Sequence, residues 1–388
     1  MRNFVKNNKD EFLFGIFFFA QALNLIPKPY SSASYVTFQY MLCYQYGFIG
    51  RGFIGTFIYY LGYMSEAKLY FVFLTATAVL TLVCLFFYHY MLSNCNMEQK
   101  NVIRAVLWTT AFMPSSICMY YRFLGGLDIY LIMISFLIAW IVCAKKNLWL
   151  IVPLCMLEVL IYPGAVFMYF LATEAMLLFL SVNDVKNSKL VFWVNSFSVG
   201  SLFLYFMLVP PYLTMTTEAI KSSMISRTSV DISEWISLID LWFGDKQGNI
   251  GTEYIFSGSF KGLVSYFIVM SPLIFFIMKF LSQYFNAKDK FYTFLLTLLP
   301  LGYLPYAIME YDHGRLTGSF LWGMFLLVLV ILKTDERATA IASDIVLKYK
   351  LKENKYILWI YLLVIGTSHE TFITVLTARL GTLLFCML

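Results

Sequence analysis

The stretch LYFVFLTATAVLTLVCLFFYHYM (residues 69–91) decides the fold class of this chain. It contains no Lys, Arg, Asp or Glu, and its apolar residues run continuously without alternating. A helix that crosses the hydrocarbon core of a bilayer needs roughly 20 such residues. The run therefore predicts a membrane-spanning helix and argues against the strands of an outer-membrane barrel.

The composition of the whole chain extends this prediction. Of 388 residues, 60% are apolar and 13% are charged, whereas a soluble domain has about 45–50% and about 25%. Lipid must therefore be the main solvent, which excludes a soluble enzyme, a nucleic-acid-binding domain and a disordered scaffold. The seven cysteines are scattered without metal-ligand spacing. They predict small apolar helix residues, and no metal site.

We expect an all-α, polytopic integral membrane protein with about 11–12 transmembrane helices, formed as a single domain over residues 1–388. A last apolar stretch, 373–388, is either a twelfth span or a surface segment. The segment 48–63 is short and rich in glycine, and it is either an interfacial helix or a further crossing. The expected spans are 12–27, 69–91, 105–121, 128–144, 148–162, 165–182, 190–210, 263–284, 291–309, 319–332 and 356–372.

The basic residues predict the orientation, because Lys and Arg concentrate in cytoplasmic loops. With a cytoplasmic N-terminus and an interfacial 48–63, most of the 28 Lys and Arg residues lie inside, among them the short-loop pairs Lys145–Lys146 and Lys186/Lys189. This arrangement predicts a multi-pass protein of the bacterial inner (plasma) membrane. The segments 28–68 and 211–262 then become the two long periplasmic loops.

Each long loop has an expected surface element. The first loop, 28–68, holds the interfacial helix. In the second, 211–262, the stretch DISEWISLIDLWF (231–243) places its apolar residues at helical spacing. It predicts an amphipathic helix that lies on the membrane surface. We therefore expect a function that is carried out on the outer face of the membrane.

Arg51 stands among four glycines in the segment GFIGRGFIG (47–55). A guanidinium group binds phosphate through two parallel hydrogen bonds, and glycines allow a close approach to the backbone. The segment predicts a phosphate-binding site. The alternative is an interfacial arginine at the lipid headgroups, with glycines that serve helix packing.

Two further outer turns carry charged residues. Arg122 and Asp128 flank the turn RFLGGLD, where they either pair with each other or leave Asp128 to open a helix as a base or metal ligand. The segment 309–315 holds Glu310, Asp312, His313 and Arg315. Glycosyl transfer needs a base for the acceptor hydroxyl and cations for the phosphate groups, and this segment contains both. The alternative is a solvated turn whose charges neutralise each other.

Two carboxylates lie inside expected spans. Glu158 stands about one helical turn from the outer surface, and Glu174 is nearer the centre of the membrane. Charged groups at this depth usually face the protein interior. They indicate either a proton-coupled transporter or structural hydrogen bonds to a neighbouring helix.

Four segments, taken in order, resemble the O-antigen polymerase-like family, polytopic bacterial membrane proteins of capsule and O-antigen gene clusters. They are GFIGRGFIGTF (47–57), RFLGGLDIYL (122–131), YPGAVFMYF (162–170) and EYDHGRL (310–316).

The resemblance places Arg51, Asp128, Asp312 and Arg315 at matching positions of the family pattern. Tyr162-Pro163-Gly164 stands where the family tends to have His-Glu-Gly, and Leu316 replaces a usual Trp. These departures put a catalytic role for the 162–164 turn and sugar stacking at position 316 in doubt.

The resemblance implies assembly of a surface polysaccharide by a repeat-unit polymerase for O-antigen or capsule. Its partners would be an undecaprenyl-diphosphate-linked oligosaccharide and the lipid bilayer. A chain-length regulator is a further option, and no nucleic-acid partner is expected. Arg51, Arg122 and Arg315 would bind the diphosphate, while Asp312, His313 or Asp128 would act as the base. Glu310 and Glu158 are secondary candidates. No cofactor is expected, and the need for a divalent cation stays open.

Two alternatives remain. A GT-C type glycosyltransferase that uses a lipid-phosphosugar would add one sugar on the outer face, but such enzymes usually have an acidic residue in the first outer loop, and residues 28–65 contain none. A polysaccharide-precursor transporter or flippase would use Glu158 and Glu174. Such proteins usually show inverted repeats, and none is evident.

Overall fold

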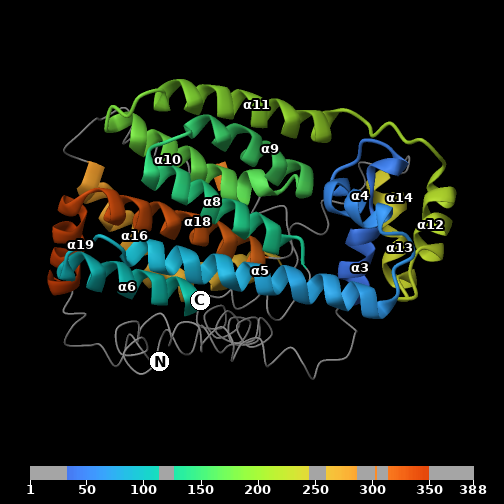
Figure 1. Cartoon of the computed structure of the whole chain (residues 1–388), viewed down its shortest axis with the longest axis horizontal. Coiled ribbons are helices and arrows are strands. Elements are labelled where there is room, and N and C mark those ends of the chain that lie inside the picture. The colour runs from blue at the N-terminus through green and yellow to red at the C-terminus, as the bar shows by residue number, and fades with distance from the viewer. Residues whose placement is uncertain (1–32, 113–125, 244–258, 286–301, 304–312, 349–388) are drawn as a thin grey trace.

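The computed structural model describes residues 33–112, 126–243, 259–285, 302–303 and 313–348 (Figure 1). Within these ranges the chain is helical. The β-type pairing described there is confined to two isolated bridges, Gly47 with Leu213 and Met64 with Thr228. The predicted all-α fold class is therefore confirmed for the described part of the chain.

Long helices form an elongated bundle. The bundle helices are α5 (Glu66–Leu92), α6 (Met97–Phe112), α8 (Asp128–Ala144), α9 (Ile151–Ile161, preceded by the turn η2, Leu148–Leu150), α10 (Leu171–Val182, preceded by the π-helical turn η3, Val166–Phe170), α11 (Ser188–Leu208), α16 (Ser259–Phe285) and α18 (His313–Thr334). Most helices that follow each other in the chain run in opposite directions along the bundle, whereas α16 and α18 both end beside α19 (Glu336–Lys348; Figure 1).

Helix α18 lies at the centre of this bundle. A helix that is apolar on all sides is typical of a buried position, and every residue from Ser319 to Leu332 is buried. Trp322 contacts Phe136 of α8 edge to face, with ring centroids 5.2 Å apart. Gly323 allows α10 to approach closely, because a Cβ at this position would lie 2.6 Å from the Cβ of Ala172.

Short helices form a separate assembly at one end of the bundle, which we call the head (residues 33–64 and 213–243; Figure 1). The two parts of the head are far apart in sequence and are joined by both β-bridges. The opposite end carries α19 (Glu336–Lys348), which bends by 120° from α18. The head helices are α3 (Ala33–Met41), η1 (Tyr44–Tyr46), α4 (Gly52–Tyr60), α12 (Thr217–Ser226), α13 (Ser233–Ile236) and α14 (Leu238–Phe243).

Both flanks of the segment 48–63 lie at the head end of the bundle. Just before it, the Tyr46 carbonyl accepts a hydrogen bond from Thr214 N–H, and just after it, Met64 N–H donates to the Arg227 carbonyl. Both flanks are thus fixed to the same second segment, 213–229. The nine-residue helix α4 lies between them.

The predicted single amphipathic helix over 231–243 is wrong. The segment forms two short helices, α13 and α14, separated at Ser237. Its apolar side chains pack inward, because Ile232 and Ile239 are buried and the Trp235 ring lies 4.8 Å from that of Tyr35. The two short helices therefore contact α3 and α12 within the head.

Two described helices, α5 and α11, are both long and apolar enough to span a membrane, and the bent pair α18–α19 gives a third if it counts as one span. Helices α8, α9 and α10 are apolar but shorter. The expected spans 12–27, 291–309 and 356–372, and the segment 373–388, lie largely or wholly outside the described residues.

Candidate functional site

The glycines of the 47–55 segment are in contact with protein backbone and side chains. A Cβ on Gly47, whose φ is +125°, would collide with the carbonyl of Tyr212, and one on Gly55 would collide with the carbonyl of Leu42. A Cβ on Gly52 would lie 2.7 Å from the Tyr44 ring. These glycines therefore serve packing within the head, which is the structural alternative for this motif.

Arg51 is the residue of this motif that packing does not explain. Its backbone has φ 69° and ψ 5°, a left-handed conformation that favours glycine, and it directly precedes α4. Its guanidinium carbon lies 4.7 Å from the centroid of the Tyr162 ring, a cation–π contact. Non-glycine residues in such a conformation concentrate at binding and catalytic sites.

The turn 162–164 meets the Arg51 segment directly. A Cβ on Gly50 would lie 3.1 Å from Cγ of Pro163, and Tyr162 is buried beneath the guanidinium. The turn joins the end of α9 to the π-helical turn η3. Two of the four motifs quoted from the sequence are thus in contact.

Asp128 is the first residue of α8 and is buried, as expected for a residue that opens a helix. In the first turn of α8, the Tyr130 hydroxyl lies 2.9 Å from the Tyr40 hydroxyl of α3. This hydrogen bond attaches the start of α8 to the head. Asp128 therefore lies at the head end of the bundle, where the N-terminal helix dipole favours a carboxylate.

Helix α18 also begins at the head end. His313 is its first residue and Arg315 lies in its first turn. One turn further, the Tyr169 hydroxyl donates to Ser319 Oγ at 3.3 Å, which holds the start of α18 against η3. The structure thus brings the elements of Arg51, Asp128, His313 and Arg315 to one end (Figure 1).

Three candidates fall outside the described residues: Arg122, Glu310 and Asp312. Among the described residues, no group of three His, Cys, Asp or Glu side chains is arranged to hold a metal ion. The predictions on cofactors and cations stay predictions.

The sequence did not single out Arg227, which holds the head together. Its Nη1 donates to the Met41 carbonyl at 3.1 Å and to the Tyr46 hydroxyl at 3.0 Å, and its guanidinium lies over the Tyr59 ring at 4.5 Å. No local signal identifies this role, because the partners are more than 160 positions away in sequence.

Cys43 lies 3.6 Å from Arg227 Nη1, a setting that often activates a thiol. Burial nevertheless raises the pKa of the Cys43 thiol, and this effect outweighs the neighbouring guanidinium. Burial likewise raises the pKa of the Tyr46 phenol. Both groups therefore stay neutral at pH 7 and act as structural partners of Arg227.

Glu158 and Glu174 are buried in the bundle, where α9, α10 and α11 meet. The Glu174 carboxylate accepts hydrogen bonds from Asn195 and Ser196 of α11, as the structural interpretation of this residue predicts. Both Glu158 oxygens are buried, and no hydrogen bond reaches them from the described residues. Asn195 and Ser196 gave no signal in the sequence.

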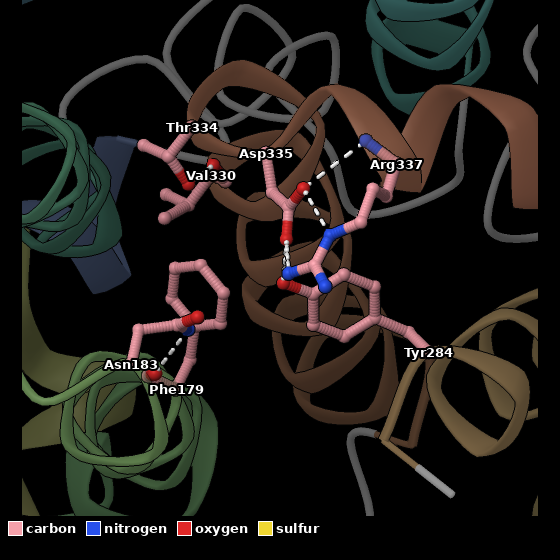
Figure 2. Close-up of polar contacts among 7 residues, drawn as sticks. All are labelled: Phe179, Asn183, Tyr284, Val330, Thr334, Asp335 and Arg337. Atoms are coloured by element: carbon pink, nitrogen blue, oxygen red, sulfur yellow. Dashed lines mark hydrogen bonds and ion pairs between the residues drawn. The ribbon is translucent and has the colours of Figure 1, made fainter. Parts of the chain in front are cut away.

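The α19 end carries a closed ion-pair cluster, drawn in Figure 2. Arg337 Nη2 donates to Asp335 Oδ2 at 2.7 Å, and the Tyr284 hydroxyl donates to the same oxygen at 2.6 Å. Burial alone would raise the pKa of Asp335, but the hydrogen bonds from Arg337 and Tyr284 hold it well below its ordinary value. The cluster joins α16 to the bend between α18 and α19.

Comparison with known proteins gives no match to a family model, a curated protein or a solved structure. The resemblance to O-antigen polymerase-like proteins therefore stays a prediction that rests on the four quoted segments.

Proposed function

We propose that the chain is a polytopic inner-membrane protein with 11–12 spans and a cytoplasmic N-terminus. The lipid-facing surface of α11 supports this, because large apolar side chains stand exposed along its length: Leu190, Trp193, Phe197, Leu204 and Leu208. A helix of 21 residues is about 31 Å long, close to the thickness of the hydrocarbon core.

The distribution of basic residues supports the same orientation. The turns at the α19 end contain Lys145, Lys146, Lys186 and Lys189, whereas the head lies at the other end. Since short cytoplasmic loops are rich in Lys and Arg, the α19 end would face the cytoplasm and the head the periplasm. Labelling of single cysteines at Lys146 and Tyr212 with a membrane-impermeant reagent tests this orientation: Tyr212→Cys should react in intact spheroplasts and Lys146→Cys only after lysis.

The function that the geometry supports best is polymerisation of surface-polysaccharide repeat units at the head end. The observation that carries this proposal is Arg51, which is held in a left-handed conformation against Tyr162, at the end where α8 and α18 begin. A guanidinium in this position suits a diphosphate, because it offers parallel hydrogen-bond donors to phosphate oxygens.

In the proposed reaction, a hydroxyl of one lipid-linked repeat unit attacks the anomeric carbon of a growing glycan. The bond between that carbon and undecaprenyl diphosphate breaks, and the diphosphate leaves as an anion. Arg51, Arg122 and Arg315 would stabilise the leaving diphosphate, while Asp128, Asp312 or His313 would accept the proton of the hydroxyl. The substrate is the undecaprenyl-diphosphate-linked oligosaccharide, and a chain-length regulator is a further proposed partner.

The test is the length distribution of the surface polysaccharide in cells that carry single variants. Arg315→Ala and Asp312→Ala should leave the protein level unchanged while long chains collapse to single repeats. Arg337→Ala, at the opposite end, is the matched control and should leave the length distribution unaltered. Normal chain length in both Arg315→Ala and Asp312→Ala would contradict the assignment of these residues.

A flippase or transporter is the second candidate, and the buried carboxyl groups of Glu158 and Glu174 favour it. It predicts uptake of a lipid-linked precursor into proteoliposomes that depends on a proton gradient. A single-sugar GT-C transferase would instead alter branching without altering chain length. The same polysaccharide profiles therefore separate all three functions.

A further inference from the structure

A buried polar cluster joins α9, α10 and α11 inside the bundle. Asn195 Nδ2 donates to Glu174 Oε1 at 2.6 Å, and Ser196 Oγ donates to Glu174 Oε2 at 2.7 Å. Each oxygen of the Glu174 carboxylate thus has one short hydrogen bond from α11. Both oxygens of Glu174 are therefore compensated by donors of α11.

Glu158 belongs to the same cluster but lacks such compensation. Its side chain is fully buried, and neither oxygen has a hydrogen-bond partner among the described residues. Cys155 connects the two groups: it precedes Glu158 by one helical turn on α9, and its Sγ lies 3.6 Å from Asn195 Nδ2. Asn195 Oδ1 is a second buried acceptor without a donor in the described part of the chain.

No cation from the elements packed against α9 donates a hydrogen bond to the Glu158 carboxyl group, because neither of its oxygens has a partner among the described residues. The charged residues of those elements are Asp128 at the first residue of α8, Lys189 near the start of α11, and Arg51 directly before α4, whose guanidinium lies over the Tyr162 ring. The other ionisable groups in the cluster are Glu174 and the Cys155 thiol, neither of which supplies positive charge.

An isolated carboxylate in an apolar interior is strongly destabilising unless it is paired or neutralised. A single proton removes the Glu158 charge and converts an orphan acceptor into a hydrogen-bond donor. We propose that Glu158 is a proton-binding site, which holds one proton in the interior of the bundle on α9.

The site lies directly beneath the Arg51 contact. The Glu158 carbonyl accepts a hydrogen bond from Tyr162 N–H at 2.8 Å, and the Tyr162 ring carries the guanidinium of Arg51. A change in the charge of Glu158 therefore acts on the last turn of α9, next to the motif segment 47–55. The proton site itself does not depend on the proposed polymerase activity.

Infrared spectroscopy of the purified full-length protein in lipid nanodiscs at pH 7 tests the proposal. Wild type should show the carbonyl stretching band of a protonated carboxyl group that exchanges slowly in D₂O. Glu158→Gln should abolish this band, since the amide keeps the size and neutrality of the protonated acid. Glu174→Gln should retain the band, and so should Glu66→Gln, in which the changed carboxylate is exposed.

Absence of the band from wild type would overturn the proposal. So would a band that persists in Glu158→Gln and disappears in Glu174→Gln, because Glu174 would then be the protonated group. If Glu174→Gln does not fold, Ser196→Ala takes its place: it removes one donor from Glu174, and the Glu158 band should persist. Glu158→Gln itself should unfold at the same temperature as wild type. A marked fall in its unfolding temperature would show that the fold needs a Glu158 anion, which would overturn the proposal.

Discussion

The two ends of the bundle are held together in different ways. At the α19 end, Asp335, Arg337 and Tyr284 form a closed cluster in which the carboxylate is neutralised by its neighbours. At the head end, the two segments are joined by contacts between residues more than 160 positions apart, made by Gly47 and by one arginine, Arg227. Arg51 lies at the same end, in a left-handed backbone conformation and with its guanidinium over the Tyr162 ring.

This difference separates charged residues that stabilise the fold from charged residues that are candidates for binding a ligand. Asp335 and Arg337 satisfy each other, and Arg227 Nη1 donates hydrogen bonds within the head, whereas its buried Nη2 has no hydrogen-bond partner among the described residues. Arg51 instead occupies a backbone conformation that an arginine adopts only at a cost of order 1 kcal/mol or more. We therefore interpret the head as the part of the structure that positions Arg51. Each variant below tests one part of this comparison.

The largest expected effect is that of Gly55→Ala. The new methyl group would collide with the carbonyl of Leu42, so α4 must move away from the end of α3. We expect a loss of about 3 kcal/mol or more in the free energy of unfolding. Thermal unfolding of the purified protein followed by size-exclusion chromatography measures it. Gly200→Ala is the control, because a Cβ at Gly200 meets nothing within 4 Å, and it should be neutral or slightly stabilising.

Arg227→Ala should have the next largest effect. It leaves the Met41 carbonyl and the Tyr46 hydroxyl without their guanidinium donor. Hydrogen bonds from a charged group contribute about 1.5–3 kcal/mol, so we expect a loss of about 2 kcal/mol and faster proteolysis of residues 213–243. Arg227→Lys should restore little, because a single ammonium group lacks the planar, forked donor set. If Arg227→Ala resists proteolysis as well as wild type does, backbone contacts alone hold the head together.

Asp335→Asn should have a smaller effect, of about 1–2 kcal/mol, and a pH dependence. Hydrogen bonds from Arg337 and Tyr284, opposed by burial, hold the folded-state pKa of Asp335 below its unfolded value. The stabilisation is therefore fully present above the unfolded pKa of about 4 and is lost as the pH falls toward the folded pKa.

Unfolding temperatures measured between pH 7 and pH 3 check this prediction. Wild type should lose stability over that range more steeply than Asp335→Asn, whereas Asp344→Asn, an exposed change on the adjoining helix α19, should follow wild type. Parallel curves for wild type and Asp335→Asn would contradict the role of the ion pair.

Much of the bundle was predictable because its signal is local. The expected helix over 128–144 coincides with α8, and the expected span 69–91 falls within α5, Glu66–Leu92. Continuous apolar runs determine such helices without reference to distant partners. The α18 helix was also predicted, although its position at the centre of the bundle is a property of packing.

The head was not predictable to the same degree, because its contacts are long-range. The stretch 231–243 has a helical period, yet it breaks at Ser237 and turns Ile232 and Ile239 into the head. The glycines of 47–55 give the same sequence signal for a bound phosphate and for neighbouring backbone. Only the positions of the Leu42 and Tyr212 carbonyls distinguish the two interpretations.

The most direct measurement is the binding of undecaprenyl diphosphate to wild type and to Arg51→Gly in nanodiscs, followed as a shift in unfolding temperature. Glycine relieves the left-handed backbone strain and removes the Tyr162 contact, and these effects are similar in size and opposite in sign. Without lipid, the two proteins should therefore unfold at nearly the same temperature. With lipid, wild type should be stabilised and Arg51→Gly should not; equal stabilisation of both, or of neither, would contradict an anion-binding role for Arg51.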